Sequence, residues 1–154
     1  MAIGPYTGTV RSITPVLTDD NWILSGGAGE VAVVMRAGAG GETTTTTAMC
    51  TRWNAAVIDA SPGALTAGNV GKGTPNLPTN TVSFGTTFAT NQPALAAGDL
   101  WAESWNAHGG IVRWEARDET DAWVLIGAAT EKLIVCRNSV GVGLSTYGVT
   151  WEEF

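Results

Sequence analysis

Hydrophobic residues in this chain recur in short runs that are rich in β-branched and aromatic side chains. Glycine, asparagine, aspartate or proline ends each run, at intervals of about 8–15 residues. Helical periodicity is almost absent, and this spacing is typical of an all-β sandwich or barrel. The runs predict strands at 8–16, 21–24, 31–36, 43–53, 81–90, 100–106, 111–117, 123–128, 131–137 and 147–153. We therefore predict an antiparallel two-sheet sandwich, jelly-roll-like, with about 8–10 strands.

Two of the predicted strands differ in how their apolar residues are distributed. In 111–117, Val112, Trp114 and Ala116 alternate with charged residues, which indicates a half-buried antiparallel strand. Residues 122–128 are instead apolar at positions that face both sides. This run predicts either a central strand or a strand whose outer face meets another subunit.

Three segments stand out from this pattern. Residues 61–80 are rich in glycine, proline and asparagine, which predicts a long loop of the kind that is often functional or ordered by a partner. Residues 1–20 contain two prolines and are expected to serve as an extended N-terminal arm. The threonine run at 43–47 favours extended backbone, and we assign it to a strand. The turn-like glycines at 37–41 separate two predicted strands.

The length fits one domain, 1–154.

The composition indicates a surface that is covered in the working state. Only 14% of the residues are charged, whereas the chain contains seven tryptophans and 20 glycines. Each buried indole removes roughly 150–250 Å² from water. Such a chain is expected to form a rigid, self-associating β body, either a homo-oligomer or a subunit seated on a larger assembly.

Charge and hydropathy exclude several classes of partner. The net charge of −6, with eight scattered basic residues, leaves no basic surface for nucleic acid. No run reaches the roughly 18 apolar residues that a membrane span needs, and no secretory signal is expected from the first residues. Cys50 and Cys136 are expected to be small buried hydrophobic residues; a disulfide between them would require suitable geometry and an oxidising compartment.

Sequence motifs for catalysis are weak. The segment 68–74 resembles a phosphate-binding loop but lacks its first glycine and its serine or threonine after Gly-Lys. His108, the single histidine, lies beside two glycines in a predicted turn, and neither Ser104 nor Ser145 stands in a nucleophile elbow. The acidic residues at 118–121 match no calcium-loop spacing and predict a solvated turn. We expect no enzyme activity and no cofactor or metal.

Glu103 is the residue with the most open interpretation, because it lies between Trp101 and Trp105 on one predicted strand face. An acid flanked by aromatic rings could have a raised pKa and act in glycoside hydrolysis, but no second carboxylate is identified. The same pattern fits a sugar-stacking platform. It also fits a core or subunit interface in which a buried acid pairs with an arginine such as Arg113.

Several segments together carry a resemblance to a known class. The run Thr43–Thr47 followed by Met49–Trp53, the Gly/Thr/Trp-rich strands and the closing segment Ser145–Trp151 resemble small virion proteins of tailed bacteriophages. Within that class the chain is most similar to capsid decoration (cement) proteins and to jelly-roll modules of head or tail appendages. The resemblance has no diagnostic motif, and no functional residue is carried over from it.

The resemblance implies a structural protein, commonly trimeric, that sits on the outer surface of a capsid after assembly in the host cytoplasm. Its partners are then its own copies and a major capsid protein. The alternative is a carbohydrate-binding or receptor-binding module of a phage appendage, in which Trp101 and Trp105 stack sugars around Glu103. From their aromatic character or their place in the 61–80 loop, we expect the contact residues to be Tyr6, Trp53, Trp101, Trp105, Trp151, Phe154, Lys72 and Asn76.

Overall fold

A computed structural model shows a chain built of antiparallel strands. It describes residues 1–15, 20–27, 29–57, 66–86, 94–118, 120–126, 132–141 and 143–154, and these contain eleven strands and no helix. The strands are β1 (Ile3–Ile13), β2 (Asp20–Ser25), β3 (Val31–Gly41), β4 (Ala48–Val57), β5 (Asn69–Lys72), β6 (Ser83–Gly85), β7 (Ala94–Asn106), β8 (Ile111–Glu115), β9 (Trp123–Ile126), β10 (Lys132–Val140) and β11 (Ser145–Glu153).

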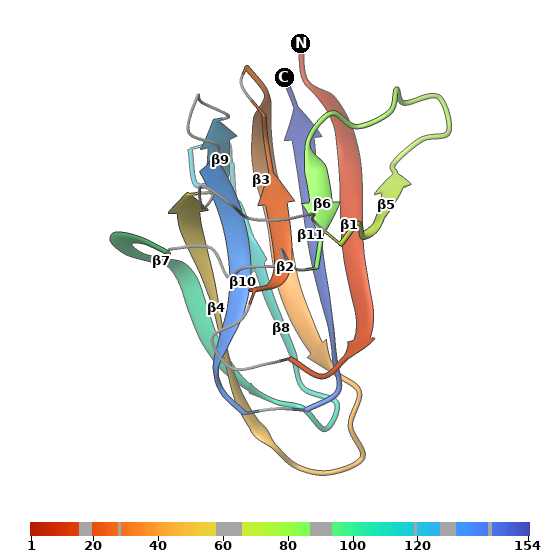
Figure 1. Cartoon of the computed structure of the whole chain (residues 1–154). Coiled ribbons are helices and arrows are strands. Elements are labelled where there is room, and N and C mark those ends of the chain that lie inside the picture. The colour runs from red at the N-terminus through yellow and green to blue at the C-terminus, as the bar shows by residue number, and fades with distance from the viewer. Residues whose placement is uncertain are drawn as a thin grey trace.

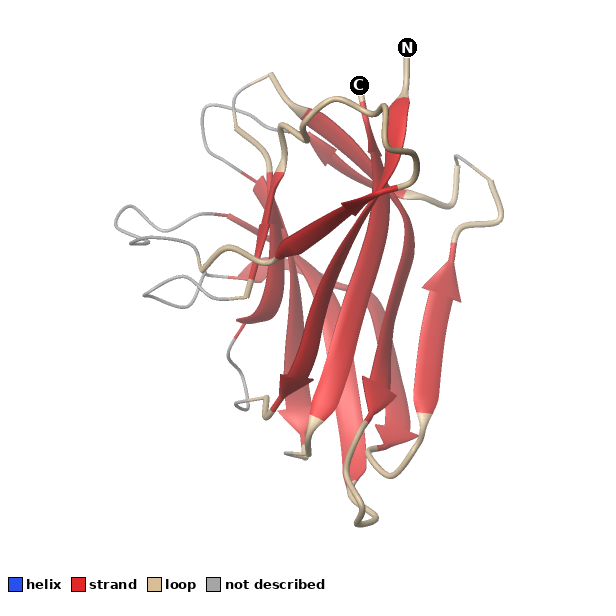
Figure 2. Ribbon diagram, turned by 90° about the vertical axis from the view of Figure 1, so that its right-hand side faces the viewer, coloured by secondary structure: helices blue, strands red, loops and turns tan. Residues whose placement is uncertain are grey.

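The strands form two sheets that lie face to face (Figures 1 and 2). Sheet A has the order β5-β1-β11-β3-β8, and β9 also pairs with β3; sheet B has the order β6-β2-β10-β4-β7. The chain crosses between the sheets repeatedly, and both termini lie at the same end of the sandwich (Figure 1). This architecture confirms the predicted antiparallel two-sheet sandwich.

One expectation about the first 80 residues is wrong, and a second is incomplete. The proposed N-terminal arm is largely strand β1, which pairs with β11 on one side and β5 on the other. The predicted 61–80 loop is confirmed over residues 73–80, but strand β5 lies inside it; residues 61–65 lie outside the described part. Tyr6 explains the first difference, because its fully buried ring fixes β1 in the core. Backbone pairing with β1 explains the second, because it holds even a glycine-containing segment extended.

The threonine run is also not a strand. Residues 43–47 connect β3 to β4 as a loop. The Thr43 hydroxyl donates to the carbonyl oxygen of Thr45 at 2.6 Å and accepts from the Thr45 N–H at 2.9 Å. Local side-chain hydrogen bonds of this kind compete with strand pairing, so a β-favouring side chain does not guarantee a strand.

Aromatic rings join the two sheets through two separate stacks. In the first, the Trp101, Trp53, Trp123 and Trp114 rings follow one another with centroid distances of 4.5, 6.5 and 3.9 Å, from β7 and β4 of sheet B to β9 and β8 of sheet A. In the second, the Trp22, Phe84, Trp151 and Tyr6 rings follow at 6.2, 6.1 and 5.9 Å, from sheet B to sheet A. The aromatic residues therefore hold the sheets together within one chain.

The two cysteines do not form a disulfide. Both are free, and they point to opposite faces of sheet B, because Cys136 is fully buried opposite Trp53 whereas Cys50 lies three residues before Trp53 and is half-buried. Burial raises the pKa of the Cys136 thiol well above its usual value, and the nearby Asp20 adds to this effect. Cys136 thus behaves as the small buried hydrophobic residue that the sequence predicts.

Candidate functional site

Most of the aromatic residues expected at contacts lie inside the sandwich. Tyr6, Trp53 and Trp151 are fully buried, and Trp105 is nearly so. The expectation that these four form an exposed contact surface is wrong, because their rings pack between the sheets. Trp101 is half-buried in the first stack.

The other expected contact residues are exposed but scattered. Phe154 follows β11 at the end of the sandwich where the termini lie. Lys72 and Asn76 belong to β5 and the loop after it, and Lys72 Nζ donates to the Leu77 carbonyl oxygen at 3.0 Å. The structure therefore does not gather the predicted contact residues into one site.

The sugar platform around Glu103 is not formed as the sequence suggested. The Trp105 indole N–H donates to the Thr51 hydroxyl at 2.8 Å within the core, and the Trp101 ring stacks on Trp53. Glu103 is exposed at the free edge of β7. The two rings thus contact the core, and their faces are not paired around the acid.

Residues that might have formed a hydrolase site are not joined by hydrogen bonds in the described part of the chain. His108 is exposed in the turn after β7, whereas the Ser145 hydroxyl is buried and donates to the Gly143 carbonyl oxygen at 2.6 Å. Asp118 accepts from the side chain and N–H of Thr120, which lowers the pKa of the Asp118 carboxyl and closes the turn. Among the described residues no group of three or more metal-ligating side chains is present.

The outer face of sheet A is the most distinctive surface of the molecule. Strand pairing aligns its outward residues in five rows that cross β8 or β9, β3, β11 and, in two rows, β1. From the end with the termini, the rows are Ile126-Val31-Phe154, Val124-Val33-Glu152, Glu115-Arg36-Thr150-Thr7, Arg113-Gly38-Gly148-Thr9 and Ile111-Gly40-Thr146. We call the first two rows the apolar end and the last two rows the glycine trough.

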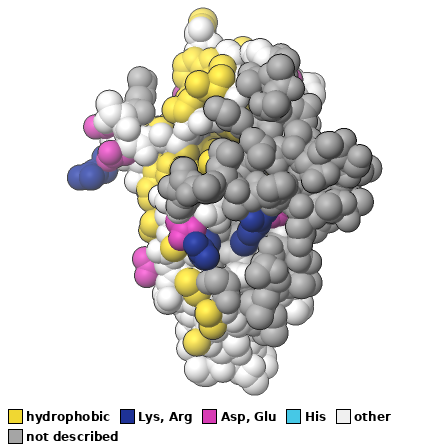
Figure 3. Space-filling model, turned by 60° about the vertical axis from the view of Figure 1, so that its left-hand side comes forward, with side chains coloured by type: hydrophobic (Ala, Val, Ile, Leu, Met, Phe, Trp, Pro, Cys, Tyr) yellow, Lys and Arg dark blue, Asp and Glu magenta, His cyan; other side chains and the backbone are white. Residues whose placement is uncertain are grey.

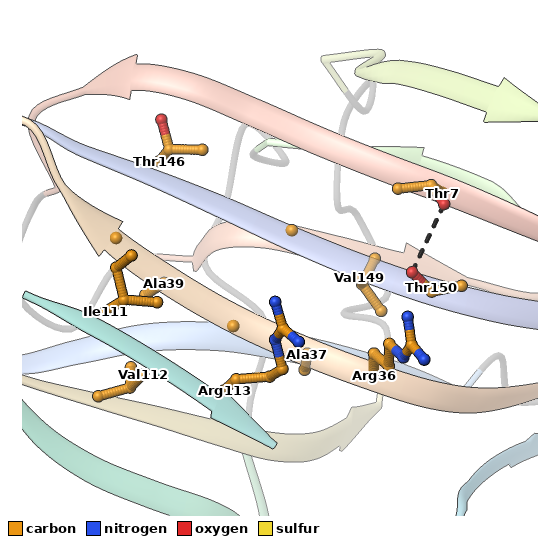
Figure 4. A pocket seen from close by; sticks show the side chains of 13 residues that line it. Thr7, Arg36, Ala37, Ala39, Ile111, Val112, Arg113, Thr146, Val149 and Thr150 are labelled. Carbon is orange, nitrogen blue, oxygen red and sulfur yellow. Dashed lines mark hydrogen bonds between the residues drawn. The ribbon is translucent and has the colours of Figure 1, made fainter. Parts of the chain in front are cut away.

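The glycine trough is a shallow hollow of about 360 Å³ on this face. Gly38, Gly40 and Gly148 leave backbone bare at its floor, and Thr146 and Thr150 line it from β11 (Figure 4). Only Gly38 has an internal reason to be glycine, because an added Cβ would lie 2.8 Å from the Val112 carbonyl oxygen. Gly40 and Gly148 would place a Cβ at ordinary contact distances of 3.9 and 3.7 Å. Glycines of this kind in a strand often mark close approach by a ligand or another backbone.

Two arginines border the trough on the same side of the sheet as the threonines (Figure 4). Arg36 pairs with Glu115 at 2.6 Å, and both side chains are largely exposed. Arg113 lies opposite Gly38 and forms no hydrogen bond or ion pair within the described residues. Among the described residues the trough therefore offers one uncompensated guanidinium, whereas the Thr146 hydroxyl already donates to Glu42 and the Thr7 and Thr150 hydroxyls bond to each other.

The apolar end continues the same face, and of its six residues only Glu152 has a charged side chain. Val124, Ile126 and Phe154 are more than half exposed, while Val31 and Val33 are half-buried. Figure 3 shows hydrophobic side chains (yellow) that lie next to one another on the face that it presents. Residues 123–126 form an edge strand, so the expectation of a central strand is wrong; the alternative, an outer face that meets another subunit, stays a prediction.

Local pattern did not reveal the glycine trough. The sequence predicts a turn at 37–41, but β3 continues through Gly41. The usable signal is that glycine alternates with alanine at 37–40, so that alanine faces the core and glycine faces outward. The alignment of Gly38 with Gly148 depends on pairing between β3 and β11, which are far apart in sequence.

The glycines allow a matched test within one strand. We expect Gly40→Ala to raise the free energy of unfolding by about 0.5–1 kcal/mol, because alanine restricts the unfolded chain and finds room here. Gly38→Ala should lower it, because its Cβ would collide with backbone. Urea denaturation measures both; equal effects would contradict the view that Gly40 is dispensable for folding.

Comparison of the chain with protein-family models, curated proteins and solved structures found no match. None of the described segments is a helix of the length and apolar character needed to cross a membrane.

Proposed function

We propose that this chain is a non-enzymatic structural protein of a tailed-phage virion, acting as a capsid decoration protein that adheres through the outer face of sheet A. One observation carries the proposal: this face combines exposed apolar side chains with bare backbone over five aligned rows. A broad, shallow surface of this kind suits a protein partner with a large contact area, since specific interfaces bury about 800 Å² on each side.

The rest of the molecule is consistent with a cohesive role. Two aromatic stacks tie the sheets together and make the body rigid, so that a bare face can be held in one shape. The low content of charged residues favours a surface that is covered when the protein works. Assignment to a phage capsid comes from the resemblance of the sequence, and the geometry supports only the adhesive part.

The test uses virions of the phage that encodes the chain. We expect purified particles to contain the protein in many copies, and particles stripped of it to bind the purified wild-type chain to saturation in co-sedimentation. Ile126→Glu should weaken that binding, whereas Val140→Glu, an exposed apolar residue on sheet B, should not. Virions without the protein, or stripped particles that do not bind it, would overturn the proposal.

A further inference from the structure

The outer face of sheet A is complementary to itself. Outward residues of β11 follow the order Thr146, Gly148, Thr150, Glu152 and Phe154, so that small residues lie on one side of Thr150 and large ones on the other. Strand β3 repeats this arrangement, with Gly40 and Gly38 on one side of Arg36 and Val33 and Val31 on the other. The outward side chains of both strands therefore change from small to large at the same row.

Two such faces become complementary when a twofold axis lies between them, perpendicular to the strands and level with Thr150. Rows lie about 7 Å apart along a strand, and the axis brings rows at equal distances from Thr150 together. It places Val33 of one copy over Gly38 of the other, and Val31 over Gly40. We propose that the outer face of sheet A is the interface of a twofold-symmetric dimer of this chain, in which the apolar end of each copy fills the glycine trough of the other.

Charge supports a second copy as the occupant. Arg113 and Glu152 lie in rows that the axis superimposes, and within the described residues neither forms a hydrogen bond or ion pair. In the dimer, each Arg113 lies in the same row as the Glu152 of the other copy, two strands apart, and its long side chain already projects over β3 (Figure 4). The pairing occurs twice, as an interface between identical surfaces requires.

Glycine placement supports the same occupant. Gly40 and Gly148 lower the stability of an isolated sheet, and no contact among the described residues requires them. In the dimer Gly40 admits Val31 of the other copy, and Gly148 leaves room for its Glu152. The exposed Ile111 at the far edge of the trough then meets Ile126, which is exposed at the opposite edge of the apolar end.

The test is the mass of the purified full-length chain in solution, without any virion component. Sedimentation velocity and native mass spectrometry should show a dimer of twice the 15.9 kDa chain mass. Val124→Arg should weaken dimerisation by about ten- to hundredfold, since it removes one buried valine contact and places a second guanidinium against Arg113 of the other copy. Val140→Arg is the matched control, because the two valines are 52% and 53% exposed and Val140 lies on sheet B; it should leave the dimer intact.

Two further variants separate the dimer from effects on folding. Gly148→Val fills the trough with a strand-favouring residue. We expect this variant to be monomeric and at least as resistant to urea as the wild-type chain. Arg113→Glu and Glu152→Arg should each weaken the dimer, and combining them should restore it.

A wild-type chain that is monomeric at about 100 µM, or that forms a trimer, would overturn the inference. So would equal effects of Val124→Arg and Val140→Arg, a Gly148→Val variant that still dimerises, or a charge-reversed pair that dimerises no better than its single variants. Both proposals use the outer face of sheet A, so the dimer is the state of the free chain, and capsid binding competes with it. A monomer that binds capsids overturns only the dimer, and a dimer that does not bind capsids overturns only the proposed function.

Discussion

Replacing Trp53 by alanine should lower the free energy of unfolding by about 3–5 kcal/mol, the usual range for a buried tryptophan. The Trp53 ring is fully buried between the Trp101 ring at 4.5 Å and the Trp123 ring at 6.5 Å. Its removal opens a cavity and breaks the ring contact between the two sheets. A domain of this size is typically stable by about 5–15 kcal/mol, and the loss is a large share of that. Urea denaturation followed by far-ultraviolet circular dichroism measures it.

Trp101→Ala is the matched control for Trp53. The same ring type leaves the same stacked pair, but Trp101 is half-buried at the edge strand β7, and we expect a clearly smaller loss. Near-ultraviolet circular dichroism should change in both variants, because each breaks the Trp53–Trp101 contact. A loss below about 1 kcal/mol for Trp53→Ala would contradict the view that this stack holds the sheets together.

Replacing Glu153 by leucine should lower the free energy of unfolding by on the order of 3 kcal/mol, because buried donors lose a charged acceptor. The Glu153 carboxylate is buried and accepts four hydrogen bonds of 2.8–3.1 Å. Their donors are the N–H and hydroxyl of Thr81, the N–H of Val82 and the indole N–H of Trp151. One side chain thus joins the segment before β6 to the last strand of sheet A.

The glutamine variant distinguishes this role from simple packing. Glu153→Gln keeps one acceptor oxygen and nearly the same shape, so it should lose less stability than Glu153→Leu. Amide hydrogen exchange should accelerate at Thr81 and Val82 in both variants, and more in the leucine variant. Unchanged exchange at these two amides would show that the carboxylate does not anchor the segment.

The strands were predictable to the extent that side chains alternate along them. Residues 111–117 show that alternation, and β8 lies there with Val112 and Trp114 facing inward. Prediction failed where backbone pairing outweighs local preference, since β5 contains a glycine and β3 continues through the glycines at 38, 40 and 41. It also failed at the threonine run, which is a loop with local side-chain hydrogen bonds. A residue's own propensity is small compared with what a neighbouring strand supplies.

The candidate site was predictable only in part. The low charge and the two-sided apolar run at 122–128 pointed to a covered surface, and Val124 and Ile126 are indeed exposed apolar residues. The tryptophans were assigned to that surface because composition cannot distinguish a ring that packs within a chain from one that packs between chains. The residues that form the trough carry no motif, since their common feature is a shared row.

The sequence by itself determined that this chain is an all-β sandwich, because a period of two residues follows directly from the geometry of a strand. It also determined that the surface has little charge to keep copies apart. The tertiary structure alone decided which rings meet, and that Gly38, Gly148 and Arg113 share one row. Pairing register and the packing of one sheet on the other set those relations, and they join residues more than 100 positions apart that no local pattern connects.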